Sequence, residues 1–304
     1  MTTVLTEVPH AIPLLAERFP DVTFIDISTD CGEDVTGDIL FGGIGPHTAT
    51  VVDRGVKWVQ LPFTGIDHAP PDSLRAQTVT AAKGAGAIPI SEYVMSALLA
   101  CSRDFPANWL REAPERWNYQ RTTALHGQTL SLIGFGGIAQ RVARLAAAFD
   151  MKILATRRHA SHGVVDGVQL VESVDELLAP AHHLVVCAPL TPETHHLLND
   201  ERFTKVTPGL HVVNIARGAI IDQDALRRAL DDGRVARASL DVTDPEPLPA
   251  GHWLYEHPRV FLTPHSSWTG TPFFSGAIDI FADNLERYLA GQPLVGVIDR
   301  ELGY

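Results

Sequence analysis

The sequence predicts an α/β protein with a doubly wound parallel sheet and a second, smaller α/β domain. From about residue 127 onwards, short apolar runs alternate with helical patterns, and a glycine-rich turn separates the first run from the first helix. Runs that are apolar throughout indicate strands covered on both faces, which is typical of parallel sheets with helices on either side. At 304 residues the chain is long enough for two domains.

The first hundred residues predict the smaller domain. Four short apolar runs are candidates for its strands: VTFIDIS (22–28), DILFGG (38–43), VKWVQLP (56–62) and TVTAAK (78–83). A helix over residues 92–104 then leads into the larger domain. The pattern leaves open which of the two domains a last helix, over residues 277–291, packs against.

Six further runs predict the strands of the larger domain: 129–134, 151–156, 183–189, 210–216, 238–242 and 259–265. Between the first two lies a helical pattern with one apolar face, formed by Ile138, Val142, Leu145, Ala146 and Phe149. Between the fourth and fifth lies DQDALRRALDDG, in which residue 222 is the predicted N-cap and the glycine at 233 the predicted stop.

Composition excludes several classes of protein. The net charge of -12 argues against nucleic acid as a partner. No apolar run approaches the roughly 20 residues of a membrane span, and the start MTTVLTEVPH lacks the pattern of a secretory signal. Three widely spaced cysteines, Cys31, Cys101 and Cys187, fit reduced thiols. We therefore expect a cytoplasmic protein without membrane or nucleic-acid partners.

Two pairs of adjacent histidines, at residues 182–183 and 195–196, raise the question of a metal site. Adjacent residues on a strand point to opposite faces, so such a pair cannot readily share one ion. Surface or strand-end positions are the simpler interpretation. We therefore expect no metal.

A glycine loop connects the first strand of the larger domain to its helix. The segment matches G-x-G-x-x-G/A, with Ala139 in the third place, and its expected cofactor contacts are Gly134, Phe135, Gly136, Gly137 and Ile138. Glycines in this context permit a tight turn and let backbone N–H groups approach a pyrophosphate at the helix N-terminus. A turn without a ligand is the alternative, but the strand–turn–helix context favours dinucleotide binding.

Two arginines at the end of the second strand indicate which dinucleotide binds. The residue that usually bonds the adenine ribose lies roughly 20 residues past the glycine loop, and Arg157 lies 18 residues past Ala139. A guanidinium there favours a 2′-phosphate, Arg158 follows it, and Thr156 adds a hydroxyl. The sequence therefore predicts NADP(H), with NAD(H) and a merely solvated basic turn as alternatives.

Three polar residues follow the last strands of the larger domain, at the edge where open α/β sheets bind ligands. They are Arg217, Glu246 and His265. An arginine can clamp a carboxylate, and a histidine oriented by a carboxylate can exchange a proton near neutral pH. Each residue alone could be structural, but together they suit hydride transfer to a 2-keto acid.

Five segments in succession resemble the motifs of the D-isomer-specific 2-hydroxyacid dehydrogenases. They are GFGGIAQRVARLAAAFDMKILA, CAPLTPETHHLLN, HVVNIARGAIIDQDAL, ASLDVTDPEPLP and VFLTPHSSW. The resemblance is specific from about residue 125 to 270, and weaker in FTGIDHA and IPISEYVMSALL.

The resemblance implies a role for each candidate residue. Arg217 would bind the substrate carboxylate and carbonyl, His265 would be the acid/base, and Glu246 would pair with it. The substrate site would also include Phe63, Thr64 and Gly65. Further cofactor contacts would come from Ala188, Pro189, Thr194, Ala216 and Asp241, the last near the nicotinamide carboxamide.

The resemblance also implies an architecture. A Rossmann domain, residues 97–276, would be inserted in a smaller flavodoxin-like domain, residues 1–96 and 277–304, and the protein would be a homodimer. Trp268 either shapes a substrate pocket or packs between the domains. Four residues before the first Rossmann strand, Trp109, Trp117, Tyr119 and Arg121, either pack across the dimer, which we favour, or contact substrate.

The predicted function is NADP(H)-dependent reduction of a small 2-keto acid such as glyoxylate or hydroxypyruvate. Arg157 stands where NAD-using members of the family carry an acidic residue, which agrees with this cofactor. Oxidation of another small acid, such as phosphite, is one alternative, because the family's phosphite dehydrogenases share the Arg-Glu-His set. A dinucleotide-sensing corepressor that binds proteins is another.

Overall fold

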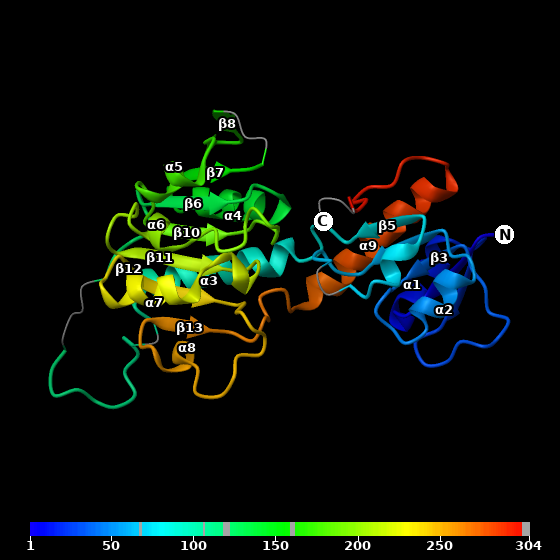
Figure 1. Ribbon diagram of the computed structural model, residues 1–304, viewed down its shortest axis with the longest axis horizontal. Helices are drawn as coiled ribbons and strands as arrows, with labels where there is room; N and C mark the ends of the chain where they lie inside the picture. The colour runs from blue at the N-terminus through cyan, green and yellow to red at the C-terminus, as the bar shows by residue number, and fades with distance from the viewer. Residues whose placement is uncertain (67–68, 106, 118–121, 159–161, 300–304) are drawn as a thin grey trace. The chain divides into compact units, whose positions relative to one another are not determined.

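The computed structural model describes residues 1–66, 69–105, 107–117, 122–158 and 162–299 (Figure 1). The chain forms two compact units, residues 1–86 with 270–304 and residues 87–269. The predicted domain boundaries lie later in the chain. They fall at 96/97 instead of 86/87, and at 276/277 instead of 269/270. The first difference arises because helix α3 (Ala87–Arg103) belongs whole to the larger unit, where Val94 and Leu98 lie in the same core as α4 (Gly137–Ala147).

The smaller unit contains a five-stranded parallel sheet in the order β2-β1-β3-β4-β5. Its strands are β1 (Thr3–Thr6), β2 (Thr23–Asp26), β3 (Ile39–Phe41), β4 (Trp58–Leu61) and β5 (Thr78–Ala81). This order is that of flavodoxin-like sheets. The sequence analysis omitted β1, because TVLT is a run of four residues with a threonine at each end.

Helix α9 (Thr271–Leu289) packs within the smaller unit, which answers the question that its sequence pattern left open. Its Phe281 stacks on Phe41, with ring centroids 4.3 Å apart, and on Trp58, with centroids 5.5 Å apart. The unit also contains α1 (Ile12–Arg18), α2 (Thr48–Asp53) and the short 3-10 helices η1 (Pro9–Ala11) and η2 (Ser73–Arg75).

The larger unit contains an eight-stranded sheet in the order β13-β12-β11-β10-β6-β7-β9-β8. Its strands are β6 (Thr129–Ile133), β7 (Lys152–Thr156), β8 (Gly163–Val165), β9 (Val168–Leu170), β10 (His183–Val186), β11 (Leu210–Asn214), β12 (Val235–Leu240) and β13 (Val260–Leu262). All neighbours are parallel except β8 and β9. The strand order reverses between β6 and β10, as in Rossmann sheets, so the predicted fold class is confirmed.

Helices cover both faces of this sheet, as the apolar strands predict. Val185 of β10 lies in one core cluster with residues of α3 and α4, whereas Leu184 and Val186 lie in a second cluster on the opposite face. The second cluster contains residues of α5 (Val174–Leu178), α6 (Asp200–Phe203) and α7 (Gln223–Asp231). The unit also contains η3 (Gly218–Ile220) and α8 (Trp253–Glu256).

Two helix ends test the sequence patterns directly. Asp222 caps α7, because its Oδ1 accepts the N–H groups of residues 224 and 225 at 3.0 Å, and Gly233 has a φ of 85°, so both predicted signals are confirmed. In contrast, α4 ends at Ala147, and Phe149 lies beyond it with 39% of its surface exposed. The predicted apolar face is therefore wrong at its C-terminal end.

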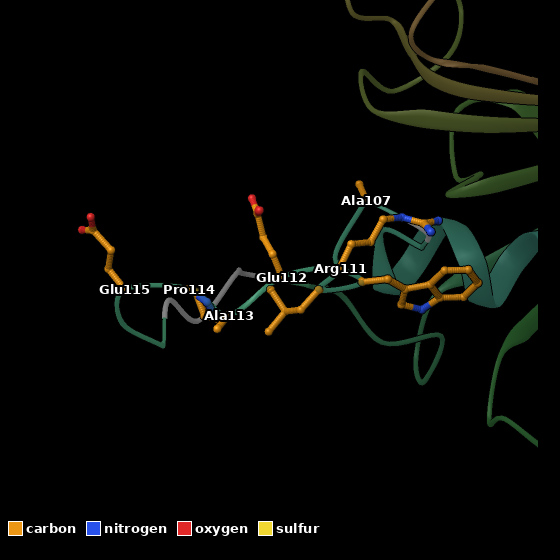
Figure 2. Close-up of a pocket in the computed structure, with 8 residues that line it drawn as sticks. Ala107, Arg111, Glu112, Ala113, Pro114 and Glu115 are labelled. Carbon is orange, nitrogen blue, oxygen red and sulfur yellow. The ribbon is translucent and has the colours of Figure 1, made fainter.

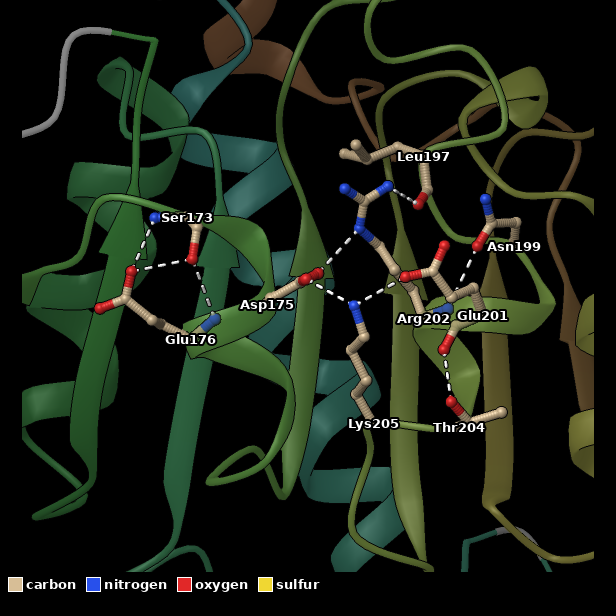
Figure 3. A network of polar contacts seen from close by, with 9 residues as sticks. All are labelled: Ser173, Asp175, Glu176, Leu197, Asn199, Glu201, Arg202, Thr204 and Lys205. Carbon is tan, nitrogen blue, oxygen red and sulfur yellow. Dashed lines mark hydrogen bonds and ion pairs between the residues drawn. The ribbon is translucent and has the colours of Figure 1, made fainter.

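A network of polar contacts joins α5 to α6 (Figure 3). The Asp175 carboxylate accepts hydrogen bonds from Arg202 Nε at 3.0 Å and Lys205 Nζ at 2.6 Å, and the Lys205 bond is the main reason that the pKa of Asp175 is lowered. Arg202 also donates to the carbonyl of Leu197 at 2.8 Å. The network thereby anchors the end of the long loop that follows β10. None of the helices in the described part of the chain combines the length and apolarity needed to cross a bilayer.

Candidate active site

The candidate residues of the larger unit lie in the loops that follow its parallel strands. In Figure 1 the arrows of β6, β10 and β11 point to the same side of the sheet. The loops after these strands and after β7, β12 and β13 carry the predicted catalytic residues and most of the predicted cofactor residues, whereas Thr156 ends β7 and Gly137 and Ile138 begin α4. Parallel strands thus gather at one edge side chains that are far apart in the sequence.

The glycine loop after β6 has the geometry that a dinucleotide needs. Gly134 has a φ of 92°, and a Cβ there would lie 2.9 Å from the backbone nitrogen of Ala188, so no side chain fits. At Gly136 and Gly137 an added Cβ would meet nothing within 4 Å, which leaves open space at the start of α4. Phe135 and Ala139 are instead buried in the core beneath. The loop therefore fits a pyrophosphate at the helix N-terminus.

Arg157 and Arg158 are exposed directly after β7, and Thr156 before them is buried. Arg158 lies near Glu193 of the loop after β10. The pKa of Glu193 is lowered mainly by hydrogen bonds from the Thr191 hydroxyl and a backbone N–H, and the charge of Arg158 adds to the effect. A contact of either arginine with an adenosine phosphate stays a prediction.

The loop after β10 is held by its own hydroxyl groups. The Thr194 hydroxyl donates to the carbonyl of Pro189 and accepts the N–H of Thr191, both at 2.7 Å, so it shapes this loop. Ala188 is buried and Pro189 exposed. The two histidines at 195 and 196 lie in a turn with their rings stacked at 4.0 Å, so the strand geometry assumed for this pair is wrong.

Asn214, which the sequence analysis missed, positions Arg217. The side chain of Asn214 is 1% exposed. Its Nδ2 donates to the carbonyl of Arg217 at 2.9 Å, and its Oδ1 accepts the N–H of Ala216 at 3.1 Å. Both bonds close the turn after β11. The sequence feature that marks Asn214 is its position as a single amide at the end of the apolar run LHVVN.

Gly218 brings the Arg217 turn against the loop after β12. A Cβ at this glycine would lie 2.0 Å from the backbone carbon of Thr243 and 2.5 Å from the nitrogen of Asp244. Any side chain would therefore separate the two loops. This close approach places the segment that carries Arg217 beside the segment that carries Glu246.

Glu246 and His265 form a hydrogen-bonded pair. The Nδ1 of His265 lies 2.9 Å from Oε2 of Glu246, and Oε1 of Glu246 accepts the N–H of Thr243 at 2.9 Å. A carboxylate accepts only, so it holds the proton of His265 on Nδ1 and leaves Nε2 for exchange with a substrate. About a third of each side chain is exposed, 33% for His265 and 31% for Glu246, so solvent or substrate can reach the pair.

Asp241 holds the loop that carries His265. Its carboxylate is 1% exposed and accepts three hydrogen bonds, from Thr263 Oγ1 at 2.5 Å, Ser266 N at 2.8 Å and Ser267 N at 2.9 Å. His265 itself has a φ of 50°, an uncommon value for a residue with a side chain, and such strain persists only where neighbours enforce it. The contact of Asp241 with a nicotinamide carboxamide stays a prediction.

Trp268 also supports this loop. Its indole N–H donates to the carbonyl of His265 at 2.8 Å, and its ring packs against the core cluster that contains α3 and α4. These contacts of the Trp268 side chain therefore lie within the larger unit. A contact with substrate stays a prediction.

Tyr93 extends the support to helix α3. Its hydroxyl lies 2.8 Å from Thr263 Oγ1, and because Thr263 donates its own proton to Asp241, Tyr93 is the donor of this bond. Burial raises the pKa of Tyr93, which keeps the phenol protonated. We expect Tyr93→Phe to lower kcat by about tenfold, because a lost buried hydrogen bond is worth about 1–1.5 kcal/mol, with little change in cofactor KM.

The matched control is Tyr255→Phe, which removes a hydroxyl bonded to the carbonyl of Leu248 at 3.2 Å. Steady-state kinetics over a range of pH distinguish a positioning role from a loss of stability. A positioning role changes kcat in the Tyr93 variant and leaves the control unchanged. Equal kinetics in both variants would show that Tyr93 does not help to position His265.

The remaining predicted substrate residues, Phe63, Thr64 and Gly65, follow β4 in the smaller unit. The Thr64 hydroxyl donates to the carbonyl of Ala82 at 3.1 Å, and the N–H of Ala82 donates to the carbonyl of Phe63 at 3.0 Å. The loop after β4 is thus tied to the loop after β5. Its contact with a substrate stays a prediction.

The segment before β6 lines a hollow of about 690 Å³ (Figure 2). Its lining comes wholly from residues 107 and 109–115, none of which is a predicted catalytic residue. Trp109 and Trp117 are exposed by 57% and 75%. Tyr119 and Arg121 lie outside the described residues. The exposed rings are consistent with packing in an assembly, which stays a prediction.

Comparisons with known proteins agree with this geometry. Residues 95–267 match the model of a protein family described as "D-isomer specific 2-hydroxyacid dehydrogenase, NAD binding domain". The chain is 34% identical over 218 residues to glyoxylate/hydroxypyruvate reductase A of Serratia proteamaculans, over 71% of this chain and 68% of that one. It is 30% identical over 271 residues to the glyoxylate reductase of Thermofilum pendens, over 84% of this chain and 78% of that one.

Solved structures show the same fold. A D-isomer-specific 2-hydroxyacid dehydrogenase from Xanthobacter autotrophicus, in complex with NADPH and MES, superposes with a TM-score of 0.84 at 25% identity, over 100% of this chain and 99% of that one. A glyoxylate/hydroxypyruvate reductase from Sinorhizobium meliloti, in complex with NADP and sulfate, has a TM-score of 0.84 at 24% identity, with 100% of both chains covered.

Proposed function

The chain belongs to the D-isomer-specific 2-hydroxyacid dehydrogenase family, and we propose that it is an NADPH-dependent reductase of a small 2-keto acid, with glyoxylate and hydroxypyruvate as the first candidates. Membership in this family makes it an NAD(P)-dependent oxidoreductase that acts on CH–OH donors. The predicted family and enzyme class are therefore confirmed, whereas the substrate and the preferred cofactor are proposals.

The observation that carries the proposal is the pair of His265 and Glu246. A histidine whose Nδ1 lies 2.9 Å from a carboxylate oxygen is oriented for proton transfer through Nε2. Arg217 lies on a turn that packs, through Gly218, on the loop carrying Glu246. A cation for a carboxylate and an acid/base for a carbonyl are the two groups that a 2-keto acid requires.

Each residue has one part in the proposed reaction. Arg217 binds the substrate carboxylate and fixes the direction of the carbonyl. The glycine loop would hold a nicotinamide cofactor, which would supply the hydride when bound. His265 donates a proton from Nε2 to the carbonyl oxygen as it becomes a hydroxyl. Glu246 keeps the imidazole in place and stabilises its charged form before the proton leaves. Asn214 and Asp241 hold the two loops that carry these groups.

The preference for NADPH is proposed from Arg157 and Arg158. Both are exposed at the end of β7, where a carboxylate would repel a 2′-phosphate. The relatives from Xanthobacter and Sinorhizobium, which were solved with NADPH and NADP, support the same choice.

We expect Arg157→Asp to weaken NADPH binding by about 10- to 100-fold, since a charge-assisted hydrogen bond is worth about 1.5–3 kcal/mol. NADH binding should be unchanged or tighter, because a carboxylate can accept from the ribose hydroxyl. Fluorescence titration with both cofactors measures the change. Lys152→Asp, at the opposite end of β7, is the control. Equal losses for NADPH and NADH would contradict the proposed role.

The homodimer is also a proposal. The family resemblance implies it, and the exposed Trp109 and Trp117 in the segment before β6 support it. Two exposed tryptophans in one short segment are unusual on a protein surface that has no partner. We favour interface packing for this segment over contact with the substrate.

A panel of substrates tests the proposed function. Initial rates of NADPH loss would be measured with glyoxylate, hydroxypyruvate, pyruvate and phenylpyruvate, and compared with NADP⁺ reduction by phosphite. We expect turnover of the small keto acids. Turnover of phosphite alone would favour the alternative function, in which the enzyme oxidises phosphite. Cofactor binding with no turnover of any compound would favour a dinucleotide-sensing corepressor.

A further inference from the structure

A buried cluster of metal-binding side chains lies beneath helix α3, on strands whose opposite ends carry the active-site loops. His183 is the first residue of β10, and its partner in the register of the neighbouring strand β11 is His211. Cys101 lies near the end of α3. The two histidines are 4% and 1% exposed. One ligand atom from each of the three residues lies within 4.8 Å of the others.

The two imidazoles face each other through equivalent atoms. His183 Nδ1 and His211 Nδ1 are 3.0 Å apart. The outer nitrogens have partners of their own: His183 Nε2 lies 2.7 Å from Gln128 Oε1, and His211 Nε2 lies 3.0 Å from Ser239 Oγ. Metal-binding histidines have this arrangement, in which the outer nitrogen donates to an oxygen and the inner lone pair faces the ion.

Without a metal, a single proton between the two Nδ1 atoms completes the hydrogen bonds of the two rings. Gln128 accepts from Nε2 of His183, so Nδ1 of His183 accepts from Nδ1 of His211, and Nε2 of His211 accepts from the Ser239 hydroxyl. A hydroxyl can either donate or accept. If the Nδ1 proton of His211 moves to Nε2, Ser239 becomes the acceptor, and both inner nitrogens present lone pairs to the same point.

We propose that Cys101, His183 and His211 form a binding site for one zinc-class metal ion that joins α3 to β10 and β11, with a water molecule as the fourth ligand. Two imidazoles and a thiolate are a donor set that zinc prefers. Tetrahedral zinc needs nitrogens about 3.3 Å apart and a sulfur about 3.5 Å from each nitrogen. The Nδ1 atoms need to separate by about 0.3 Å, and the sulfur needs to move toward them.

The surroundings fit this chemistry. Burial lowers the pKa of His183 to about 4 and holds that of His211 well below its usual value, so both rings are neutral ligands at physiological pH. Burial raises the pKa of the Cys101 thiol to about 11, so the metal must displace its proton. Arg237 lies beside the cluster and is paired with Asp104, and the charges of both act on the Cys101 thiol in opposite directions.

Cobalt(II) is the probe that reports the ligands directly. The reduced, metal-free full-length protein would be titrated with Co²⁺ and followed by absorbance. We expect one equivalent to give a thiolate-to-cobalt charge-transfer band and intense tetrahedral visible bands, and zinc to displace both. Zinc should also raise Tm, and a chelator should reverse the shift.

Variants assign the ligands. Cys101→Ser should lose the charge-transfer band, whereas Cys31→Ser, in the smaller unit, should keep it. His183→Gln should weaken metal binding by more than the roughly 10- to 100-fold that loss of an outer hydrogen-bond partner typically costs. Circular dichroism checks that each variant is folded. His183 and His211 lie at the start of β10 and β11, whereas the candidate catalytic residues lie in loops that follow the ends of strands, so Cys101→Ser should retain activity.

Three results would overturn the site. They are the absence of a charge-transfer band in the wild-type protein, its persistence in Cys101→Ser, and unchanged affinity in a folded His183→Gln variant. The expectation that the chain binds no metal would then stand. These outcomes do not depend on the proposed enzyme activity, because the probe is the metal alone.

Discussion

Replacing His265 with glutamine should lower kcat for keto-acid reduction by about 10²- to 10⁴-fold, the range that a positioned acid or base contributes. Glutamine keeps a polar side chain of similar length but cannot supply a proton near neutral pH. The glycine loop and the arginines after β7 are not altered, so NADPH affinity should change little. Stopped-flow or steady-state absorbance measures kcat, and fluorescence titration measures cofactor binding.

The control for this variant is His126→Gln. His126 is exposed, lies 3.3 Å from Asp150 and precedes β6, whereas the glycine loop follows the other end of that strand. It should retain wild-type kinetics. The companion variant Glu246→Gln should also reduce kcat, since it removes the charge that orients His265 and stabilises its protonated form. A kcat within threefold of wild type in His265→Gln would remove this residue from the chemistry.

Replacing Arg217 with alanine should lower kcat/KM for 2-keto acids by about 10²- to 10⁴-fold. A bidentate arginine makes two charge-assisted hydrogen bonds, each worth about 1.5–3 kcal/mol, and tenfold in rate corresponds to about 1.4 kcal/mol. Both KM and kcat should change, because the same side chain binds the carboxylate and aligns the carbonyl. Arg217→Lys should recover only part of the loss, since an ammonium lacks the planar fork.

Arg228→Ala is the matched control for this experiment. Arg228 is an exposed residue of α7 that pairs with Asp200, so its removal should cost at most about 1 kcal/mol of stability and leave the kinetics unchanged. Unchanged kcat/KM in Arg217→Ala would contradict the proposed carboxylate site. Equal losses for keto acids and for cofactor binding would instead indicate damage to the loop.

The sequence predicts the fold well where strands are buried on both faces. The six apolar runs of the larger unit all contain strands. β6, β10 and β11 are buried along their whole length, which leaves a continuous apolar pattern, whereas the edge strand β13 is only partly buried. Three short strands, β1, β8 and β9, were not predicted because they lack a continuous apolar pattern of sufficient length. β8 consists of three exposed residues and β9 alternates, and β1 has only four residues. Their place in the sheets depends on pairing with distant strands, which no local pattern records.

The sequence identifies the candidate catalytic residues but not what holds them. Arg217, Glu246 and His265 stand out because a charged or titratable residue follows an apolar run. Tyr93 supports the His265 loop from a helix 170 residues away, through Thr263. A spacing argument cannot find such contacts, because they exist only after the sheet and α3 have packed.

The buried cluster illustrates the same limit. Cys101, His183 and His211 are separated by 82 and 28 residues, so no ligand spacing links them in the sequence. Of the adjacent histidines at 182 and 183, His182 is exposed and His183 is buried, so the two do not face the same surroundings. Only the parallel pairing of β10 with β11 places His183 opposite His211.

The most direct test of the central claim is the reduction of hydroxypyruvate by NADPH, with the configuration of the product determined by chiral chromatography. We predict rapid consumption of NADPH and formation of D-glycerate, with slower turnover when NADH replaces NADPH. Formation of L-glycerate, or no consumption of NADPH with hydroxypyruvate and glyoxylate alike, would contradict the assignment of the site as a D-specific 2-keto acid reductase.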